Sequence, residues 1–272
     1  MTEQFSQNKK RPTVLFQVWE PFRQSVIEEN RFYLEQAKGK LLCQFNNIDK
    51  EADAAGERWL EDQAPYFDPD RDDPGSAYEN AYDHSIEFYR LLSEMRDQTR
   101  LSIIAGMFHE WDKKLRSWLV KEIRHWHDGE EALKKTWSAN FDEIAELLDA
   151  TGLAKQNTDY MRKLSTYRYV INVYKHGDGS SFETLKANHP EFLRKSPIDK
   201  ILPEFTWMDH TDLTATDQQL DELSDTIVEF WKSIPHQIND DMVAWVPQWF
   251  VKAQTRDSAR SQPKKPTSSS AG

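Results

Sequence analysis

Apolar residues recur at three- and four-residue spacing along most of the chain, which predicts a succession of amphipathic helices. The first helical region starts at Thr13, and Pro21 marks a kink or a restart within it. The second region is long, with Gly106 as the candidate position for a break. The predicted helical regions cover residues 13–63, 77–127, 130–150, 158–176, 182–193, 217–234 and 240–252.

Proline, glycine and small polar residues separate these regions. Residues 64–76 contain three prolines and a glycine and predict a loop. Gly177 is expected to end one helix, and Thr216 is expected to cap the start of another. Residues 196–213 have an irregular pattern, with a short extended segment over 205–208. The whole pattern predicts an all-α fold, in which long antiparallel helices form a bundle and shorter helices pack on it.

The chain has 272 residues, enough for one large domain or two small ones. Residues 1–12 and 253–272 are polar without apolar periodicity, so both ends are predicted to be disordered. Residues 13–76 are interpreted as an N-terminal helical extension, and residues 77–252 as the main helical domain.

Composition narrows the class of protein. The 46 acidic and 35 basic residues give a net charge of −11, which argues against a general nucleic-acid coat protein. Only nine glycines are present, which disfavours a glycine-loop nucleotide fold, and ten tryptophans suggest that large aromatic side chains join otherwise polar helices. The chain shows no signal peptide, no 18-residue apolar run and a single cysteine, Cys43. A cytoplasmic protein without a membrane partner is therefore expected.

Charge is unevenly distributed along the chain. Residues 49–73 hold ten acidic and three basic residues, whereas residues 161–200 hold eight basic and four acidic residues. The acidic run is interpreted as a solvated helix end and loop, because the glycine and terminal glutamate of a calcium loop do not follow its aspartates. The basic segment is the region that an anionic ligand would favour.

The segment around His176 carries the strongest indication of chemistry. Arg168, Asn172 and His176 are four residues apart, so on a helix they form one stripe beside the apolar face. Lys175 lies near the same edge, and backbone N–H groups of the loop that follows could hold an oxyanion. The candidate ligand-binding residues here are Tyr174, Lys175, Gly177, Asp178 and Gly179. The alternative is that His176 and Gly177 simply form a helix C-terminal cap.

This segment resembles the motif of HEPN domains (higher eukaryotes and prokaryotes nucleotide-binding), in which an arginine, commonly followed by asparagine, precedes a histidine. Asn172 and His176 match the motif, while Arg168 stands one helical turn before the usual arginine position. The stretch FHEWDKKLRSWLVKEIRHW at 108–126 also resembles the companion helix of uncharacterised bacterial HEPN-like proteins, as do NVYKHGDGSSFETLKANHPEF and IVEFWKSIP. The resemblance covers about residues 107–235.

The resemblance implies an all-α fold, dimerisation and metal-independent RNA cleavage. His176 would then be the general acid or base, and Arg168 or Lys175 would stabilise charge on the phosphate. Asn172 would orient His176 or a phosphate oxygen.

The resemblance also places three residues at helical spacing, His109, Asp112 and Arg116, in a second wall of the substrate cleft. Their alternative role is structural, with Asp112 and Arg116 forming an internal ion pair. No metal and no cofactor are expected, because His125 and His127 fall on different helix faces and no zinc spacing follows them.

Two functions from different classes follow. The first is an endoribonuclease effector in bacterial phage defence or toxin–antitoxin biology, acting as a homodimer on RNA and paired with an antitoxin or another defence-system protein. The second is a non-catalytic HEPN-like adaptor that senses a nucleotide or binds a partner protein.

Overall fold

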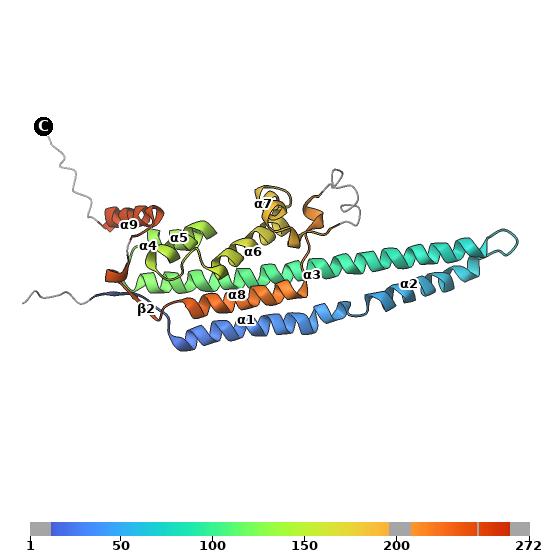
Figure 1. Ribbon diagram of the computed structural model, residues 1–272, viewed down its shortest axis with the longest axis horizontal. Coiled ribbons are helices and arrows are strands. Elements are labelled where there is room, and N and C mark those ends of the chain that lie inside the picture. The colour runs from blue at the N-terminus through green and yellow to red at the C-terminus, as the bar shows by residue number, and fades with distance from the viewer. Residues whose placement is uncertain (1–11, 196–207, 244, 262–272) are drawn as a thin grey trace, which may run out of the picture. The chain divides into compact units, whose positions relative to one another are not determined.

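The computed structural model describes residues 12–195, 208–243 and 245–261, and helices account for most of them, which confirms the all-α class (Figure 1). The helices are α1 (Glu20–Lys40), α2 (Ile48–Gln63), α3 (Pro74–Arg124), α4 (Glu130–Ser138), α5 (Phe141–Thr151), α6 (Asp159–His176), α7 (Ser180–Asn188), α8 (Asp217–Ser233) and α9 (Gln248–Ser261). Strands β1 (Val14–Gln17) and β2 (Gln237–Asn239) form a two-stranded antiparallel sheet. In the described ranges no helix is both long and apolar enough to cross a membrane.

The chain divides into two compact units, each built from separated segments. The first unit comprises Met1–Glu28, His109–Leu164 and Thr226–Gly272, and the second comprises Glu29–Phe108 and Ser165–Asp225. Helices α1, α3, α6 and α8 supply residues to both units. The predicted boundary at residue 76 falls inside the second unit.

An aromatic core organises the first unit. Phe16 of β1 contacts two tryptophans, Trp118 on α3 and Trp126 just after its end. The centroid of the Phe16 ring is 6.1 Å from the ring centroid of each indole. These indoles also donate hydrogen bonds to strand carbonyls, Trp118 to Gln17 O at 3.3 Å and Trp126 to Leu15 O at 2.8 Å. The tryptophans thus supply apolar area to the core and satisfy the backbone of an edge strand at the same time.

Helix α4 has only nine residues, and charged side chains from distant helices satisfy both of its ends. Asp257 of α9 accepts hydrogen bonds from the N–H groups of Glu131 and Ala132, at 2.8 and 3.0 Å. At the other end, Arg116 Nη1 donates to the carbonyls of Thr136, Trp137 and Ala139. Since a helix this short leaves most of its terminal backbone groups without intrahelical partners, these contacts largely define where α4 begins and ends.

Close helix packing in the second unit depends on glycine. A Cβ at Gly106 would lie 2.2 Å from Tyr33 Oη, so the absence of a side chain admits the tyrosine of α1 against α3. In the same way, a Cβ at Gly56 would lie 2.9 Å from the carbonyl oxygen of Ala81, where α2 and α3 run side by side (Figure 1). Gly106 therefore permits a helix contact without breaking α3, which is continuous over 51 residues.

The N-terminal prediction was wrong in one respect. Residues 14–17 form a strand, and α1 begins only at Glu20, so Pro21 lies in its first turn instead of causing a kink. The alternation of apolar residues around Phe16 fits helix and strand equally over so short a stretch, and pairing with β2 decides in favour of the strand. The long region to residue 63 is also divided, because a 3-10 turn at Leu42–Phe45 separates α1 from α2.

Two further helix predictions required correction. The single helix expected over 130–150 is two helices, because Asn140 and Glu143 form a capping box that starts α5. The tail expected to be disordered from residue 253 is helical as far as Ser261, with Ala253 and Asp257 buried against the first unit. Helix α6 over 159–176 and the capping of α8 by Thr216, whose Oγ1 accepts from Gln219 N, agree with the prediction.

Most of the predicted extended segment at 205–208, like residues 1–11 and 262–272 of the predicted disordered ends, lies outside the described residues.

The cap on α4 makes a testable contribution to stability. Burial, the largest single influence, raises the pKa of Asp257, but hydrogen bonds from His127 and from the amides of Glu131 and Ala132 together hold it below its usual value. We expect Asp257→Ala to lower the free energy of unfolding by about 1–2 kcal/mol in urea titrations near neutral pH. The wild-type advantage should be complete above about pH 4 and should shrink as the pH falls through the lowered pKa of the folded state.

Arg256→Ala is the matched control, because Arg256 is an exposed neighbour on the same helix. Equal unfolding free energies for wild type and Asp257→Ala would contradict the capping role.

Candidate functional site

The second half of α6 is held in place by a buried tyrosine. Tyr167 donates hydrogen bonds to Gln219 O at 2.7 Å and to Glu222 Oε2 at 3.0 Å on α8. Burial and, after it, the charge of Glu222 raise the pKa of Tyr167 well above its ordinary value, so the hydroxyl remains a donor. Ile171 and Val173 are buried on the same helix, which fixes its rotation within the second unit.

The predicted polar stripe is present on α6, and its exposure increases toward the C-terminus. Arg168 and Asn172 are partly buried, and His176 is exposed. Eight residues of helix separate Arg168 from His176 by about 12 Å along the axis. The guanidinium of Arg168 lies over the ring of Tyr169, 5.2 Å from its centroid, and Asn172 Nδ2 donates to Ser181 Oγ at 3.3 Å. The three side chains thus face three different local environments.

The loop after His176 brings in a residue that sequence reasoning missed, His210. Asp178 Oδ1 accepts from the backbone N–H of His210 at 2.9 Å, and Asp178 Oδ2 lies 3.1 Å from His210 Nδ1. Gly177 and Gly179 have positive φ angles of 75° and 155°, which let the chain turn tightly there. No sequence pattern links positions 178 and 210, because the pairing spans 32 residues of intervening chain.

The pairing with Asp178 determines which nitrogen of His210 is available. An ionised carboxylate can only accept hydrogen bonds, so Nδ1 carries the proton in this contact. Nε2 is then the nitrogen left to accept a proton from a substrate. The His210 side chain is about half exposed, at 48%, so a ligand can reach it. Asp178 was expected to belong to an anion-holding loop, but its carboxylate holds this imidazole.

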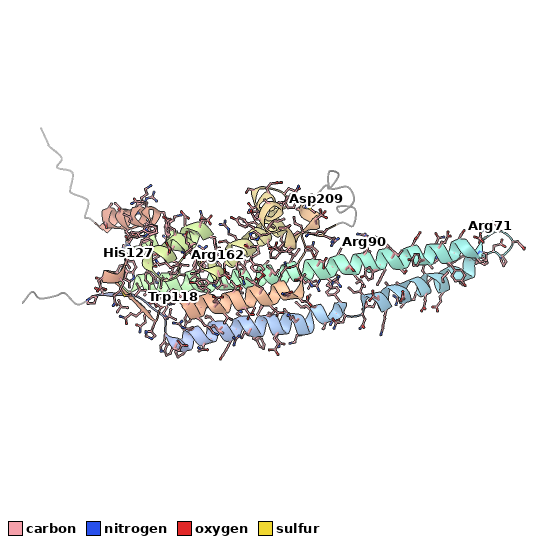
Figure 2. The ribbon with its side chains drawn as sticks, in the orientation of Figure 1. Arg71, Arg90, Trp118, His127, Arg162 and Asp209 are labelled. Carbon is pink, nitrogen blue, oxygen red and sulfur yellow. The ribbon has the colours of Figure 1, made fainter. Side chains whose placement is uncertain are left out.

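A tight turn presents His210. Asp209 Oδ1 accepts from both Thr211 Oγ1 at 2.6 Å and Thr211 N at 2.8 Å, while Asp209 N donates to Asp212 Oδ2 (Figure 2). The side-chain hydrogen bond from Thr211, followed by its backbone N–H, holds the pKa of Asp209 below the usual range. Asp209 is therefore committed to shaping the turn that carries His210.

A groove of about 450 Å³ adjoins this turn and is lined by residues of the second unit alone, among them Tyr174, Arg194 and His210. Tyr174, one of the candidate ligand-binding residues, is 37% exposed. Arg194 Nη2 is paired with Asp97 Oδ2 at 3.0 Å, and its side chain remains 48% exposed. An aromatic ring, a guanidinium and an imidazole thus border one open groove, together with the carboxylates of Glu94, Asp97 and Asp212. Lys175 is exposed on the adjoining end of α6.

The three residues of the predicted second wall belong to the first unit. Arg116 is buried and paired with Asp112, Nε to Oδ2, at 2.7 Å, and its other nitrogen caps α4 as described above. This is the structural alternative that the spacing left open. His109 is exposed on the preceding turn of α3.

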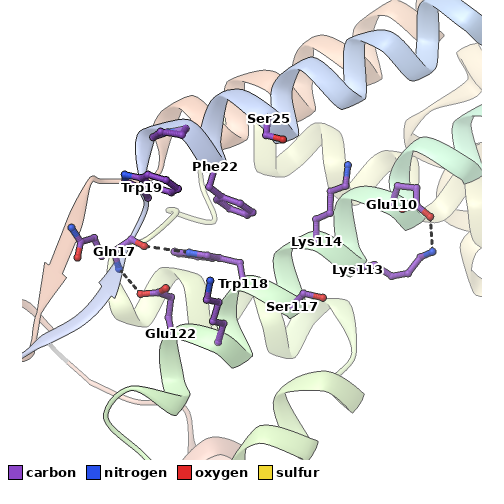
Figure 3. Close-up of a pocket in the computed structure, with 12 residues that line it drawn as sticks. Gln17, Trp19, Phe22, Ser25, Glu110, Lys113, Lys114, Ser117, Trp118 and Glu122 are labelled. Carbon is purple, nitrogen blue, oxygen red and sulfur yellow. Dashed lines mark hydrogen bonds and ion pairs between the residues drawn. The ribbon is translucent and has the colours of Figure 1, made fainter.

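The first unit has a larger groove, of about 730 Å³, whose aromatic lining includes Trp19, Phe22 and Trp118 (Figure 3). Trp19 is 68% exposed at its mouth. Charged side chains of α3 line the groove as well: Lys113, Lys114, Lys121, Glu110 and Glu122. Within this groove Lys113 is paired with Glu110, and Glu122 accepts a hydrogen bond from Gln17 N.

Comparisons with known proteins found no matching family model, no matching curated protein and no matching solved structure. In the described part of the chain, histidine, cysteine and carboxylate side chains form no cluster of three or more suited to a metal ion.

The Asp178–His210 contact predicts a specific imidazole tautomer. With ¹⁵N-labelled histidine, NMR of the wild type near neutral pH should show His210 protonated at Nδ1 while neutral. In Asp178→Ala the Nδ1-protonated fraction should fall, because the acceptor that fixes this tautomer is lost.

Asp128→Ala provides the control, since Asp128 is exposed in the other unit. An unchanged His210 spectrum in Asp178→Ala would show that the contact does not set the tautomer.

Proposed function

We propose that this protein is a HEPN-like, metal-independent endoribonuclease that acts at the C-terminal end of α6. The observation that carries the proposal is the His210 imidazole, held by Asp178 in the loop that directly follows His176. The imidazoles of His176 and His210 could supply a proton donor and a proton acceptor, the two groups that cleavage by the RNA 2′-hydroxyl requires.

In the proposed reaction His210 Nε2 takes the proton of the 2′-hydroxyl as its oxygen attacks the adjacent phosphorus. The bond from phosphorus to the 5′-oxygen breaks, and His176 in its protonated form gives a proton to that leaving oxygen. The products are a 2′,3′-cyclic phosphate and a free 5′-hydroxyl. Lys175 and Arg194 stabilise the charge that develops on the phosphate oxygens, and Tyr174 offers a ring on which a base can stack.

The biological setting belongs to the same proposal. As an effector of bacterial phage defence or of a toxin–antitoxin pair, the protein would act as a homodimer and would be held in check by an antitoxin or another defence-system protein. The resemblance over residues 107–235 supports this setting.

One observation favours the alternative, a non-catalytic adaptor that binds a nucleotide or a partner. Arg168 stands about two helical turns from His176 and stacks on Tyr169, so the arginine of the motif is not close to the histidine on the same helix. In that case the groove beside His210 would bind a phosphate-bearing ligand without cleaving it.

The nuclease proposal predicts that the purified protein cleaves RNA in the presence of EDTA and leaves 2′,3′-cyclic phosphate ends. His176→Ala and His210→Ala should each lower the single-turnover rate by about 10²–10⁴-fold, since each removes one proton-transfer group. Expression of the wild type in cells should be toxic, and either substitution should remove the toxicity.

His84→Ala is the matched control, because His84 is exposed on α3 and its position is outside the proposed site. Wild-type protein that leaves RNA intact, or histidine variants that cleave at the wild-type rate, would contradict the nuclease. Retained nucleotide binding in the inactive wild type, lost in His210→Ala, would support the adaptor.

A further inference from the structure

Nearly all of the excess negative charge of the protein lies in one helical hairpin. Residues 48–98, which comprise α2, the connecting loop and the first half of α3, hold 15 acidic and 5 basic residues, a net charge of −10 out of −11. The remaining chain is almost neutral, with 31 acidic and 30 basic residues. The hairpin belongs wholly to the second unit. Its last residues reach the groove beside His210, where Asp97 pairs with Arg194, but residues 78–89 of α3 have no role in the proposed cleavage.

An apolar stripe on α3 is left uncovered in this hairpin. Tyr78, Tyr82, Ile86 and Tyr89 are 67%, 66%, 49% and 43% exposed. Their spacing of four, four and three residues places them within about 80° of helix circumference. The contact of α3 with α2 uses a different line of small residues, where Gly56 meets Ala81. Within the described residues, no side chain covers this tyrosine stripe.

An acidic ridge runs directly beside the tyrosine stripe. Glu79, Asp83 and Glu87 also follow one another at four-residue spacing, about one residue further round the helix. Like charges at this spacing destabilise a helix by a few tenths of a kcal/mol per pair, so the arrangement has an energetic cost. Arg90, labelled in Figure 2, offsets part of this repulsion: its hydrogen bond to Glu87 holds the pKa of Glu87 below its usual range.

We propose that this face of α3 is a docking surface for a basic amphipathic helix of a partner protein. The apolar side of such a helix would cover the tyrosine stripe, and its lysines and arginines would neutralise the acidic ridge. The sign of the charge favours this occupant: a second copy that docked through the same hairpin would bring another −10 against it, and nucleic acids and anionic membranes carry the same sign. The surface is independent of the proposed cleavage site.

The test uses the full-length protein and a fluorescent helical peptide of about 20 residues, with leucine along one face and lysine elsewhere. Wild-type protein should bind it with an affinity that falls as salt rises. Tyr78→Ser/Tyr82→Ser/Tyr89→Ser should weaken binding at least about tenfold, and Glu79→Gln/Asp83→Asn/Glu87→Gln should weaken it similarly and flatten the salt dependence. All substituted side chains are exposed, and circular dichroism verifies that the fold is retained.

Two controls separate docking from simple attraction between opposite charges. Asp128→Asn/Asp225→Asn/Glu229→Gln changes the net charge equally at exposed positions outside the hairpin and should bind like wild type. A scrambled peptide of the same composition, without the leucine face, should bind at least about tenfold more weakly.

Equal binding by all three protein variants, or by both peptides, would overturn the proposal. So would tighter binding to duplex RNA or to phosphatidylserine vesicles that the tyrosine substitutions abolish. A wild-type dimer in light scattering that the tyrosine substitutions convert to a monomer would assign the stripe to a second copy instead.

Discussion

The need to satisfy backbone groups at helix ends determines much of this structure. A hydrophilic, helix-rich chain has many helix termini, and each leaves N–H and C=O groups without intrahelical partners. In the first unit charged side chains from distant segments meet this need: Arg116 and Asp257 at the two ends of α4, and Arg23 at the carbonyls of Trp231 and Lys232 in the last turn of α8. The contacts of Arg23 and Asp257 join segments more than a hundred residues apart, and those of Arg116 join α3 to α4, so the same charges that cap helices also hold the unit together.

A charged side chain also satisfies a backbone group just after the C-terminal end of α6, and there it holds a histidine as well. Glycine ends the helix, and the acidic residue that follows binds a backbone N–H and an imidazole from a turn 32 residues away. In Arg116 a charged residue is committed to structure. In Asp178 it holds a histidine that remains half exposed and that we propose to transfer protons. The buried charge of Arg116 thus stabilises the fold, whereas the exposed contact of Asp178 with His210 supports the proposed cleavage.

Charge and apolar surface are combined differently in the α2–α3 hairpin. There acidic side chains outnumber basic ones by 15 to 5, and the tyrosine stripe beside them is largely exposed to solvent. Such a surface adds nothing to the packing of the unit, and its like charges oppose helix formation. The tyrosine stripe and the α6 loop thus have separate proposed roles, the first in binding a partner and the second in cleaving RNA.

Local pattern alone determined the all-α class, the bounds of α6, the cap at Thr216 and the stripe that ends at His176, because helix periodicity and capping depend on residues within a few positions of each other. Tertiary structure decided the rest. Phe16 belongs to a strand because β2 pairs with it. Residues 253–261 belong to a helix from which Asp257 accepts a hydrogen bond at the start of α4. His210 is held at the site by Asp178. Each of these depends on a partner remote in sequence, and no local spacing records which remote residue will supply the missing hydrogen bond.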